Sequence, residues 1–371
     1  MSRGRNTQCR HFDVVQVTNE APTNRRGGAA TVVAALHAEL LARDISTAMV
    51  VVDHVHSEPE IADTLAAYPN VIFSDPDALA AITGDVWHIH AYRYTADLLE
   101  HVSRVPVLAT LHSLAAAETS GLPPSFGDDI AGQIQLMQCA ASVALVSQHE
   151  LARYRQLGYE RKYQPAHVVY NGVQTPSWHA KNLGRERLGF CGRLVPRKHP
   201  EYLLRLLAEP AFADCRALVA GRPFTADIEH WVSQLGIDAH VDFLGWCGGP
   251  RLERFYASID ALVVPSSYEP SGLVAIEASL RGIPVICTPV DGLSETMAEH
   301  AFVAIDESYA SVLAAAQAWQ AATDRDIAEL TQAARLRAST MFTASAMADR
   351  YLALYNDLRG APARVRGTTA K

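Results

Sequence analysis

The segment VVPSSYEPSGLVAIEASLRGIPVICTPVDGLSE, Val263–Glu295, is the most informative part of this sequence. A β-branched run at 261–264 predicts a strand, which is followed by a polar loop that contains Gly272. An Ala-, Leu- and Glu-rich segment predicts a helix from about Leu273, and a second apolar strand follows at 283–287. The order strand, glycine turn, helix, strand is typical of a βα unit in a parallel sheet.

The turn before this helix predicts an anion-binding site. The first N–H groups of a helix have no partner inside it, and the helix dipole is positive at that end, so the site suits a diphosphate. Glu269 lies in the loop, and Glu277 lies within the helix, roughly 6 Å further along at about 1.5 Å per residue. One carboxylate can therefore reach a group on one side of the phosphates while the other reaches the opposite side. A second glycine loop is predicted at 291–295.

The E-x7-E spacing of these two carboxylates resembles the donor-site signature of retaining, nucleotide-sugar-dependent glycosyltransferases of family 4, which have the GT-B fold. The resemblance implies that Glu269 contacts the transferred sugar and Glu277 the ribose hydroxyls. It also implies that amides of the intervening turn hold the distal phosphate. This sequence departs from the usual E-x-F-G form, because Ser271 stands where Phe is common. Whether that change alters the choice of donor is left open.

Length and composition indicate a globular protein of two domains. A chain of 371 residues is long enough for two cores, and 49% hydrophobic against 19% charged residues excludes a disordered chain. No apolar run approaches the roughly 20 residues of a membrane helix. The basic start has no uninterrupted apolar region, so no signal peptide is expected. The six cysteines show no CxxC pairing, which indicates reduced thiols and a cytoplasmic location.

The net charge of −8 is concentrated in the first half. Residues 1–180 carry 12 Lys and Arg against 18 Asp and Glu, whereas residues 181–371 carry 20 against 22. An acidic half argues against nucleic acid and anionic lipid as partners. It suits a neutral or cationic acceptor, and general solubility explains it equally well.

The first half reads as alternating strands and helices. A strand at Asp13–Thr18 leads through a glycine loop into a helix at 29–42, and the resemblance implies that Gly28 in this loop lines the acceptor side of the site. Asp75 and Asp77 form a D-x-D that favours a helix cap over a metal site. Further strands, which together predict a parallel sheet, are expected at 47–52, 71–73, 86–90, 105–110, 142–146 and 167–169.

Three histidines stand at predicted strand ends, where ligands of open α/β sheets collect. The T-x-H at His112 resembles the family position whose histidine reaches the transferred sugar. His88 and His90 resemble the H-x-H strand of the family, and a structural, hydrogen-bonded role is the alternative for each. The remaining histidines form no zinc-ligand pattern, so no metal is expected.

The second half opens with a strand at 187–191 and a glycine turn at Gly192. Arg193 and Lys198 follow the turn, and two cations aimed at a sheet edge suit a pyrophosphate, because Arg forms a bidentate fork and Lys a point charge. The segment is similar to the G-R-L…K element of the same family. Predicted donor-binding residues are Gly28, Gly192, Arg193, Lys198, Glu269, Ser271, Gly272, Leu273, Val274 and Glu277.

The predicted fold is α/β, with two Rossmann-like domains whose parallel sheets face each other across a cleft, as in GT-B proteins. Residues 1–178 form the acceptor-binding domain and 185–344 the donor-binding domain, with a linker between them. A last helix at about 345–359 crosses back to the first domain, and 360–371 form a disordered tail.

Transfer of a sugar from a nucleoside diphosphate develops negative charge on the leaving phosphate, which fixed cations and amides must stabilise. The predicted catalytic residues are His112, Glu269, Arg193 and Lys198, with no metal and no cofactor besides the nucleotide-sugar co-substrate. The resemblance implies front-face attack, in which the departing phosphate accepts the proton of the acceptor, and therefore retained stereochemistry.

Alternatives remain at this stage. A nucleotide-sugar epimerase or a sugar phosphorylase can share the fold, and a two-lobed sugar-binding protein is the non-enzyme alternative. The expected partners are a UDP- or GDP-linked hexose and a small neutral or cationic hydroxylated acceptor. Natural-product synthesis, such as that of an aminocyclitol antibiotic, and cell-surface glycan synthesis both fit, and a homodimer is left open.

Overall fold

The computed structural model describes residues 9–21, 27–52, 58–73, 79, 81–90, 98, 102, 105–118, 127–178, 180, 184–222 and 226–360. The chain divides into two compact units. Unit 1 is Met1–Gly172 with Ala344–Lys371, and unit 2 is Val173–Thr343. The D-x-D at 75–77 and the tail at 361–371 lie outside the described residues, and Gly360 ends the last helix.

Unit 1 contains a seven-stranded sheet in the order β3-β2-β1-β4-β5-β6-β7, and all of its strand pairs are parallel. The central strands β2 and β5 are buried throughout, as expected for a parallel sheet covered on both faces. Its strands are β1 (Arg10–Thr18), β2 (Thr47–Val51), β3 (Val71–Phe73), β4 (Ile82–Ile89), β5 (Val107–Leu111), β6 (Ser142–Leu145) and β7 (Ala166–Val168).

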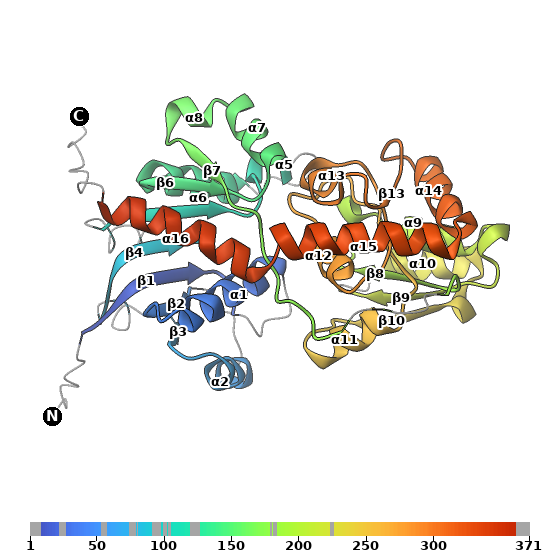
Figure 1. Ribbon diagram of the computed structural model, residues 1–371, viewed down its shortest axis with the longest axis horizontal. Coiled ribbons are helices and arrows are strands. Elements are labelled where there is room, and N and C mark those ends of the chain that lie inside the picture. Colours follow the sequence, from blue (N-terminus) through green and yellow to red (C-terminus); the bar gives the residue numbers. More distant parts are fainter. Residues whose placement is uncertain are drawn as a thin grey trace. The chain divides into compact units, whose positions relative to one another are not determined.

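The helices of unit 1 include the last helix of the chain, α16 (Ala344–Gly360), which lies against α1 and β4 (Figure 1). Met347, Tyr351, Leu354 and Leu358 are among its buried residues, at the i, i+3, i+4 spacing of one helix face. The prediction that the last helix packs on the first domain is confirmed. The other helices are α1 (Gly28–Ala42), α2 (Glu58–Ala67), α5 (Ala115–Glu118), α6 (Gly127–Cys139), α7 (Gln148–Gln156) and α8 (Tyr159–Lys162).

Unit 2 contains a six-stranded parallel sheet in the order β10-β9-β8-β11-β12-β13. Alternate residues of its strands face two separate cores. Ala261 and Val263 pack in one core, and Leu262 and Val264 in the other. The strands are β8 (Arg187–Cys191), β9 (Arg216–Ala220), β10 (Val241–Gly245), β11 (Ala261–Val264), β12 (Val285–Cys287) and β13 (Phe302–Val303).

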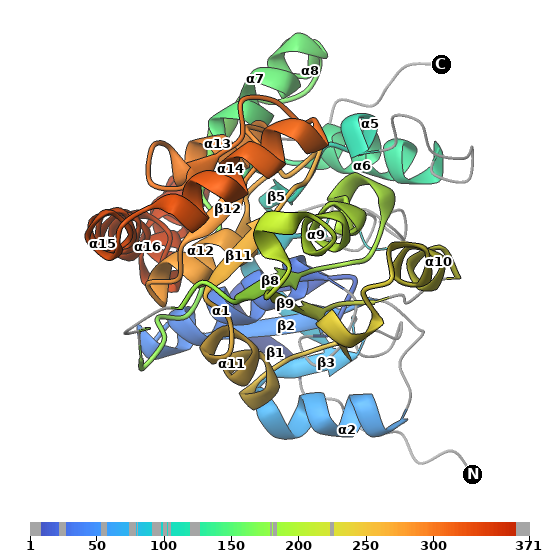
Figure 2. The same ribbon diagram turned by 90° about the vertical axis from the view of Figure 1, so that its right-hand side faces the viewer.

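The helices of unit 2 cover both faces of its sheet (Figure 2). Residues of α9, α10 and α14 pack in the first core, and those of α11, α12 and α13 in the second. Three short 3-10 turns lie at Pro196–Lys198, Pro210–Phe212 and Asp238–His240. The helices are α9 (Pro200–Leu207), α10 (Ala226–Leu235), α11 (Pro250–Ala257), α12 (Leu273–Leu280), α13 (Asp291–Met297), α14 (Tyr309–Ala321) and α15 (Asp324–Met341).

One local prediction was wrong. The expected glycine loop at 291–295 is the start of α13, where the Ser294 N–H donates to the Val290 carbonyl at 3.0 Å and the Leu293 N–H to the Glu269 carbonyl at 3.2 Å. Residues 309–341 form two helices, α14 and α15, with a break at Ala322 and Thr323. The break occurs because the Thr323 side chain accepts from the Asp326 N–H and the Asp326 carboxylate accepts from the Thr323 N–H, a capping box that starts a new helix.

The two strand orders place a switch point in each sheet. The order reverses between β1 and β4 in unit 1, and between β8 and β11 in unit 2. Ligands of open α/β sheets bind outside the carboxyl ends of the strands at such points. The predicted GT-B-like fold of two parallel α/β domains is therefore confirmed, and each domain has a candidate ligand edge.

Candidate functional site

The donor-site candidates of unit 2 follow three strands that are neighbours in the sheet. Strand β8 is followed by the glycine turn at Gly192, β11 by the loop 265–272, and β12 by the turn before α13. Because parallel strands end at the same edge, the three turns meet there. The sheet order thus brings together segments that are far apart in the sequence.

The turn at Gly192 depends on two glycines. The Gly192 N–H donates to the Ala220 carbonyl at 2.9 Å. The φ of Gly192 is +146°, a value that residues with a side chain rarely adopt. A Cβ on Gly221 would lie 1.9 Å from the Gly192 carbonyl oxygen. Both glycines are therefore required for the turn to lie against the end of β9.

Lys198 and Glu269 form an ion pair, with side chains 16% and 11% exposed. The turn that contains Arg197 and Lys198 is hydrogen-bonded to the loop that follows β11. In this contact the Arg197 carbonyl accepts from the Ser267 N–H at 2.9 Å. The Arg197 guanidinium also donates to the Tyr268 carbonyl at 3.3 Å. Burial lowers the pKa of Lys198, and the charge of Glu269 opposes this effect. The pair concentrates one cation and one carboxylate at the edge of the sheet.

Glu269 also bonds to the start of α12. Its second carboxylate oxygen accepts from the Gly272 N–H at 3.3 Å, and Gly272 caps the helix in the left-handed conformation, with φ 68°. The N–H of Glu269 donates to the Asp291 carboxylate at 3.2 Å. Asp291 itself has a φ of 41°, an uncommon conformation for a residue other than glycine. The loop is therefore held from both α12 and α13.

Glu277 lies one turn into α12 and bonds to a different element. Its carboxylate accepts from the hydroxyl of Tyr256, a residue of α11, at 2.6 Å, and the Arg281 guanidinium lies 4.7 Å above the Tyr256 ring. Burial raises the pKa of Glu277, while the Tyr256 hydrogen bond and Arg281 oppose this effect. The two carboxylates of the E-x7-E pattern thus have separate partners, Lys198 for one and Tyr256 for the other.

The remaining predicted donor residues are placed as follows. Arg193 is exposed after the Gly192 turn, and Ser271 is buried, its carbonyl accepting from Thr296 at 2.8 Å. Leu273 and Val274 are the first two residues of α12, so their amides lie where a helix offers its free N–H groups. Gly28 belongs to unit 1, where it is the exposed first residue of α1.

The three predicted histidines come together in unit 1. His112 follows β5, and its Nε2 lies 3.0 Å from Nδ1 of His90, which follows β4. His88 bonds through Nδ1 to the Tyr355 hydroxyl at 2.6 Å and through Nε2 to Thr110 at 2.7 Å. Burial lowers the pKa of His112 to about 4 and those of His88 and His90 well below 6.5. All three rings are therefore neutral at pH 7.

Sequence reasoning did not identify several residues that position this edge of unit 1. The buried Glu150 accepts from the N–H of Leu114, two residues after His112, at 3.0 Å. Gln133 accepts from the N–H of Ala115 at 3.1 Å and donates to the carbonyl of Ser113 at 2.9 Å. The sequence contains no motif that indicates a role for Glu150 or Gln133, because each side chain hydrogen-bonds to backbone groups of a loop that is distant in the chain.

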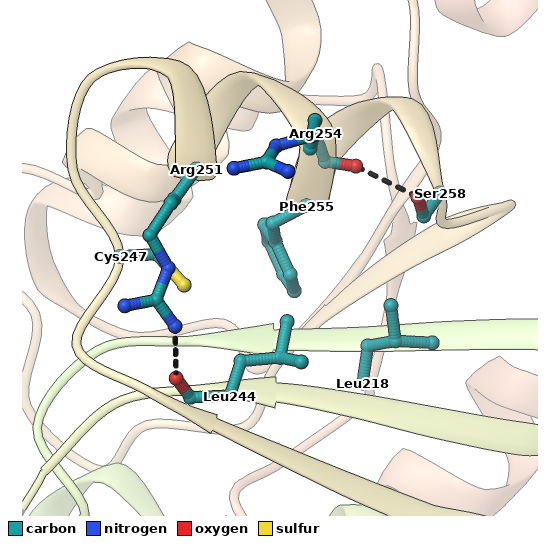
Figure 3. Close-up of a pocket in the computed structure, with 7 residues that line it drawn as sticks. All are labelled: Leu218, Leu244, Cys247, Arg251, Arg254, Phe255 and Ser258. Atoms are coloured by element: carbon teal, nitrogen blue, oxygen red, sulfur yellow. Dashed lines mark hydrogen bonds between the residues drawn. The ribbon is translucent and has the colours of Figure 1, made fainter.

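A small pocket lies between α11 and strands β9 and β10 (Figure 3). Its volume of about 250 Å³ is below the roughly 300–1,000 Å³ of pockets that enclose whole drug-sized ligands, so it does not enclose a nucleotide sugar. The Arg251 guanidinium donates to the Leu244 carbonyl at 2.9 Å beside it. Its lining residues are Leu218, Leu244, Cys247, Arg251, Arg254, Phe255 and Ser258.

Within the described part of the chain, His, Cys, Asp and Glu side chains do not gather in groups of three that could hold a metal ion. All six cysteines carry free thiols. Among the helices that the structure describes, none combines the length and apolar character that crossing a membrane requires.

Comparison with curated proteins identifies distant relatives. An uncharacterized glycosyltransferase of Methanocaldococcus jannaschii is 30% identical over 232 residues, 57% of this chain and 59% of that protein. A D-inositol 3-phosphate glycosyltransferase of Catenulispora acidiphila is 29% identical over 275 residues, 66% of each chain. The chain thus matches about three fifths to two thirds of the length of these relatives.

Solved structures share the fold over nearly the whole chain. Sucrose-phosphate synthase from Thermosynechococcus elongatus has a TM-score of 0.75 at 21% identity, covering 93% of this chain and 98% of that one. The Anabaena protein HepE, solved in complex with UDP and glucose, has a TM-score of 0.75 at 17% identity, covering 94% and 100%. The family model described as "Glycosyl transferases group 1" matches residues 176–337, nearly all of unit 2. Residues 176–337 are therefore similar to the group 1 glycosyltransferases, and the chain shares the GT-B-like fold of these two solved structures.

Proposed function

We propose that this protein is a retaining glycosyltransferase that moves a hexose from a UDP- or GDP-linked donor to a hydroxyl of a small acceptor. The observation that carries this proposal is the meeting of Lys198 and Glu269 with the N-terminus of α12 at the switch point of unit 2. A cation beside free helix amides suits a diphosphate. The HepE structure with UDP and glucose, on the same fold, supports this type of donor.

The chemistry follows from where charge develops. As the bond between the anomeric carbon and the phosphate oxygen breaks, negative charge grows on the diphosphate, where Lys198, Arg193 and the amides of 272–274 would stabilise it. The acceptor oxygen attacks the anomeric carbon from the same face, and its proton passes to the departing phosphate oxygen. Glu269 and His112 would hold hydroxyls of the sugar during this step. No metal is needed for the charge balance in this proposal.

The acceptor is proposed to be a small hydroxylated ring. Relatives named D-inositol 3-phosphate glycosyltransferases indicate a cyclitol-type acceptor, and the acidic first half of the chain suits a neutral or cationic one, such as an aminocyclitol. Natural-product or cell-surface glycan synthesis would supply such an acceptor.

Calorimetric titration with UDP, GDP and a panel of nucleotide sugars tests the donor site. One nucleotide family should bind the wild type, and Arg193→Ala should weaken binding by about 1.5–3 kcal/mol, the size of a charged hydrogen bond. Arg216→Ala is the matched control, because this exposed arginine begins β9 at the opposite end of the strand and bonds to Asp242 at 3.2 Å. Absence of binding by every nucleoside diphosphate would show that the donor-site assignment is wrong.

Product analysis separates transfer from the alternatives. An epimerase converts the nucleotide sugar without an acceptor, whereas a transferase releases the nucleoside diphosphate only when the sugar reaches an acceptor or water. Incubation of the donor alone and with inositol or an aminocyclitol, followed by chromatography of the nucleotides, distinguishes the two reactions.

A further inference from the structure

Among the described residues, the two histidines at the carboxyl ends of β4 and β5 have one ring nitrogen each without a hydrogen-bond partner. Nδ1 of His90 lies 3.0 Å from Nε2 of His112, and the two rings stack at an interplanar angle of 22°. The outer nitrogens, Nε2 of His90 and Nδ1 of His112, are buried and have no hydrogen-bond partner among the residues that the structure describes. His90 as a whole residue is only 6% exposed.

His88, two residues before His90 on the same strand end, shows the contrast. Both of its nitrogens have partners, the Tyr355 hydroxyl at 2.6 Å and Thr110 at 2.7 Å. Thr110 in turn bonds to Tyr351 at 3.0 Å. An unsatisfied buried polar atom costs about 1–3 kcal/mol, and native proteins retain few of them. The two outer nitrogens lie at the carboxyl ends of neighbouring parallel strands, where ligands of open α/β sheets bind, so this place in the fold suits a ligand.

The shared hydrogen bond couples the two rings. Two neutral imidazoles carry two N–H groups between them, and one of these lies in the bond between His90 and His112. If His90 donates, His112 carries its other hydrogen on Nδ1 and His90 has a free acceptor at Nε2. If His112 donates, the two roles are exchanged. In both arrangements one outer nitrogen is a donor and the other is an acceptor.

Both rings are neutral in the folded protein, because burial lowers the pKa of each histidine, that of His112 to about 4. Addition of one proton to the pair would leave one hydrogen in the inner bond and one on each outer nitrogen, so both outer nitrogens would be donors and the complementary pair would be lost. The donor–acceptor arrangement therefore exists at neutral pH.

We infer that His90 and His112 act as one coupled donor–acceptor pair for the hydroxyl groups of a sugar or cyclitol ring, and that His90 is a positioning residue that sets the tautomer of His112. The inference rests on the proposed function, since a polyhydroxylated substrate supplies hydroxyls that both donate and accept. It assigns a role to His90, whose neighbour His88 serves the packing of α16 instead.

Three substitutions of His90 distinguish the effect of the inner bond, between His90 Nδ1 and His112 Nε2, from the effect of the outer nitrogen, His90 Nε2. An Asn amide lies near the Nδ1 position of a histidine ring, so His90→Asn keeps a partner for His112 and removes the outer nitrogen. A Gln amide reaches the Nε2 position, so His90→Gln keeps the outer group and removes the inner bond. His90→Leu removes both. Thermal unfolding of each variant shows whether it is folded, and the two amides keep the test valid if His90→Leu does not fold.

The direct readout is the ¹⁵N spectrum of His112 in protein labelled with ¹⁵N-histidine, where the two ring nitrogens report the tautomer. We expect the same tautomer distribution of His112 in the wild type and in His90→Asn, where the inner bond is kept, and a different distribution in His90→Gln and His90→Leu, where it is lost. In transfer assays, His90→Asn should raise KM for the hydroxylated substrate, and His90→Gln should lower kcat, each about tenfold. An unchanged tautomer in all His90 variants, with unchanged KM and kcat, would overturn the inference.

Two controls keep this test independent of the donor site. His88→Asn keeps the bond to Tyr355 and loses that to Thr110, so it should lower the unfolding temperature without changing the tautomer of His112. Binding of UDP and GDP, measured by calorimetry, should stay within twofold of wild type in every His90 variant. If the wild type binds no nucleoside diphosphate, the proposed function fails, while the tautomer spectra still decide whether His90 controls His112.

Discussion

At the residue scale, the Glu269 carboxylate bonds to the groups that the proposal assigns to the donor phosphate. It accepts from Lys198 and from the Gly272 N–H, so within the chain it acts as an internal anion at the start of α12. Binding of a diphosphate would draw both donors toward the phosphate oxygens. The carboxylate would then be released to accept from hydroxyls of the sugar.

This arrangement predicts opposite effects of Glu269→Gln on binding and on transfer. A neutral amide competes less well for Lys198, so UDP or GDP should bind about two- to tenfold more tightly, while transfer falls because the sugar loses its charged acceptor. Calorimetry and a transfer assay measure the two effects. Glu277→Gln is the matched control, and it should weaken binding because its predicted contact is the ribose. Weaker nucleotide binding by Glu269→Gln would contradict the internal-anion role.

The buried histidines predict how stability depends on pH. Burial lowers the pKa of His112 from 6.5 to about 4, so between these values the unfolded chain binds a proton that the folded chain does not. The free energy of unfolding should therefore fall as the pH decreases through this window, by about 1.4 kcal/mol per unit for each such histidine. Urea unfolding of the wild type and of His112→Asn between pH 7 and pH 5 measures it, and an equal loss in both proteins would exclude His112 as a source.

At the element scale, the end of β9 determines where the Gly192 turn lies. Gly221→Ala should destabilise unit 2 by about 1–3 kcal/mol and weaken nucleotide binding, because its Cβ would displace the Gly192 carbonyl. Gly236→Ala is the control, since it has a positive φ of 66° but no atom within 4 Å of the added Cβ. That variant should lose stability through backbone strain and keep nucleotide binding. Chemical unfolding and calorimetry on both variants provide the comparison, and equal binding losses would contradict the prediction.

The elements themselves were largely predictable. Short apolar runs predicted β8, β11 and β12, because buried parallel strands are short and apolar on both faces. The start of α13 was missed because Gly292 favours a loop and only the packing of Leu293 and Met297 in the core offsets this.

At the scale of the whole molecule, the last helix completes a unit that begins at the other end of the chain. Tyr351 and Tyr355 of α16 are buried in unit 1, where they bond to Thr110 and His88. Unit 2 is one continuous segment, Val173–Thr343, with cores of its own. The two units therefore depend on α16 differently.

A chain that ends at Thr343 should lose the protection of unit 1 and keep that of unit 2. Without α16, His88 and Thr110 lose buried partners and the apolar face against α1 is exposed to water. Hydrogen exchange read by mass spectrometry should show fast exchange in β1, β4 and β5 and slow exchange in β8, β9 and β11. A chain that ends at Gly360 is the control and should match the full protein. Retained protection of β4 in the shorter chain would contradict this role of α16.

The α/β class, most strands, the glycine turns and the E-x7-E pattern could be predicted from the sequence, because these features depend on residues close together in the chain. The tertiary structure alone decided the pairings of Lys198 with Glu269, 71 positions apart, of His90 with His112, 22 apart, and of His88 with Tyr355, 267 apart. Local propensity and hydrophobic period specify an element, but not which element becomes its neighbour. Strand order in the two sheets and the docking of α16 made these contacts, and they define the chemistry proposed here.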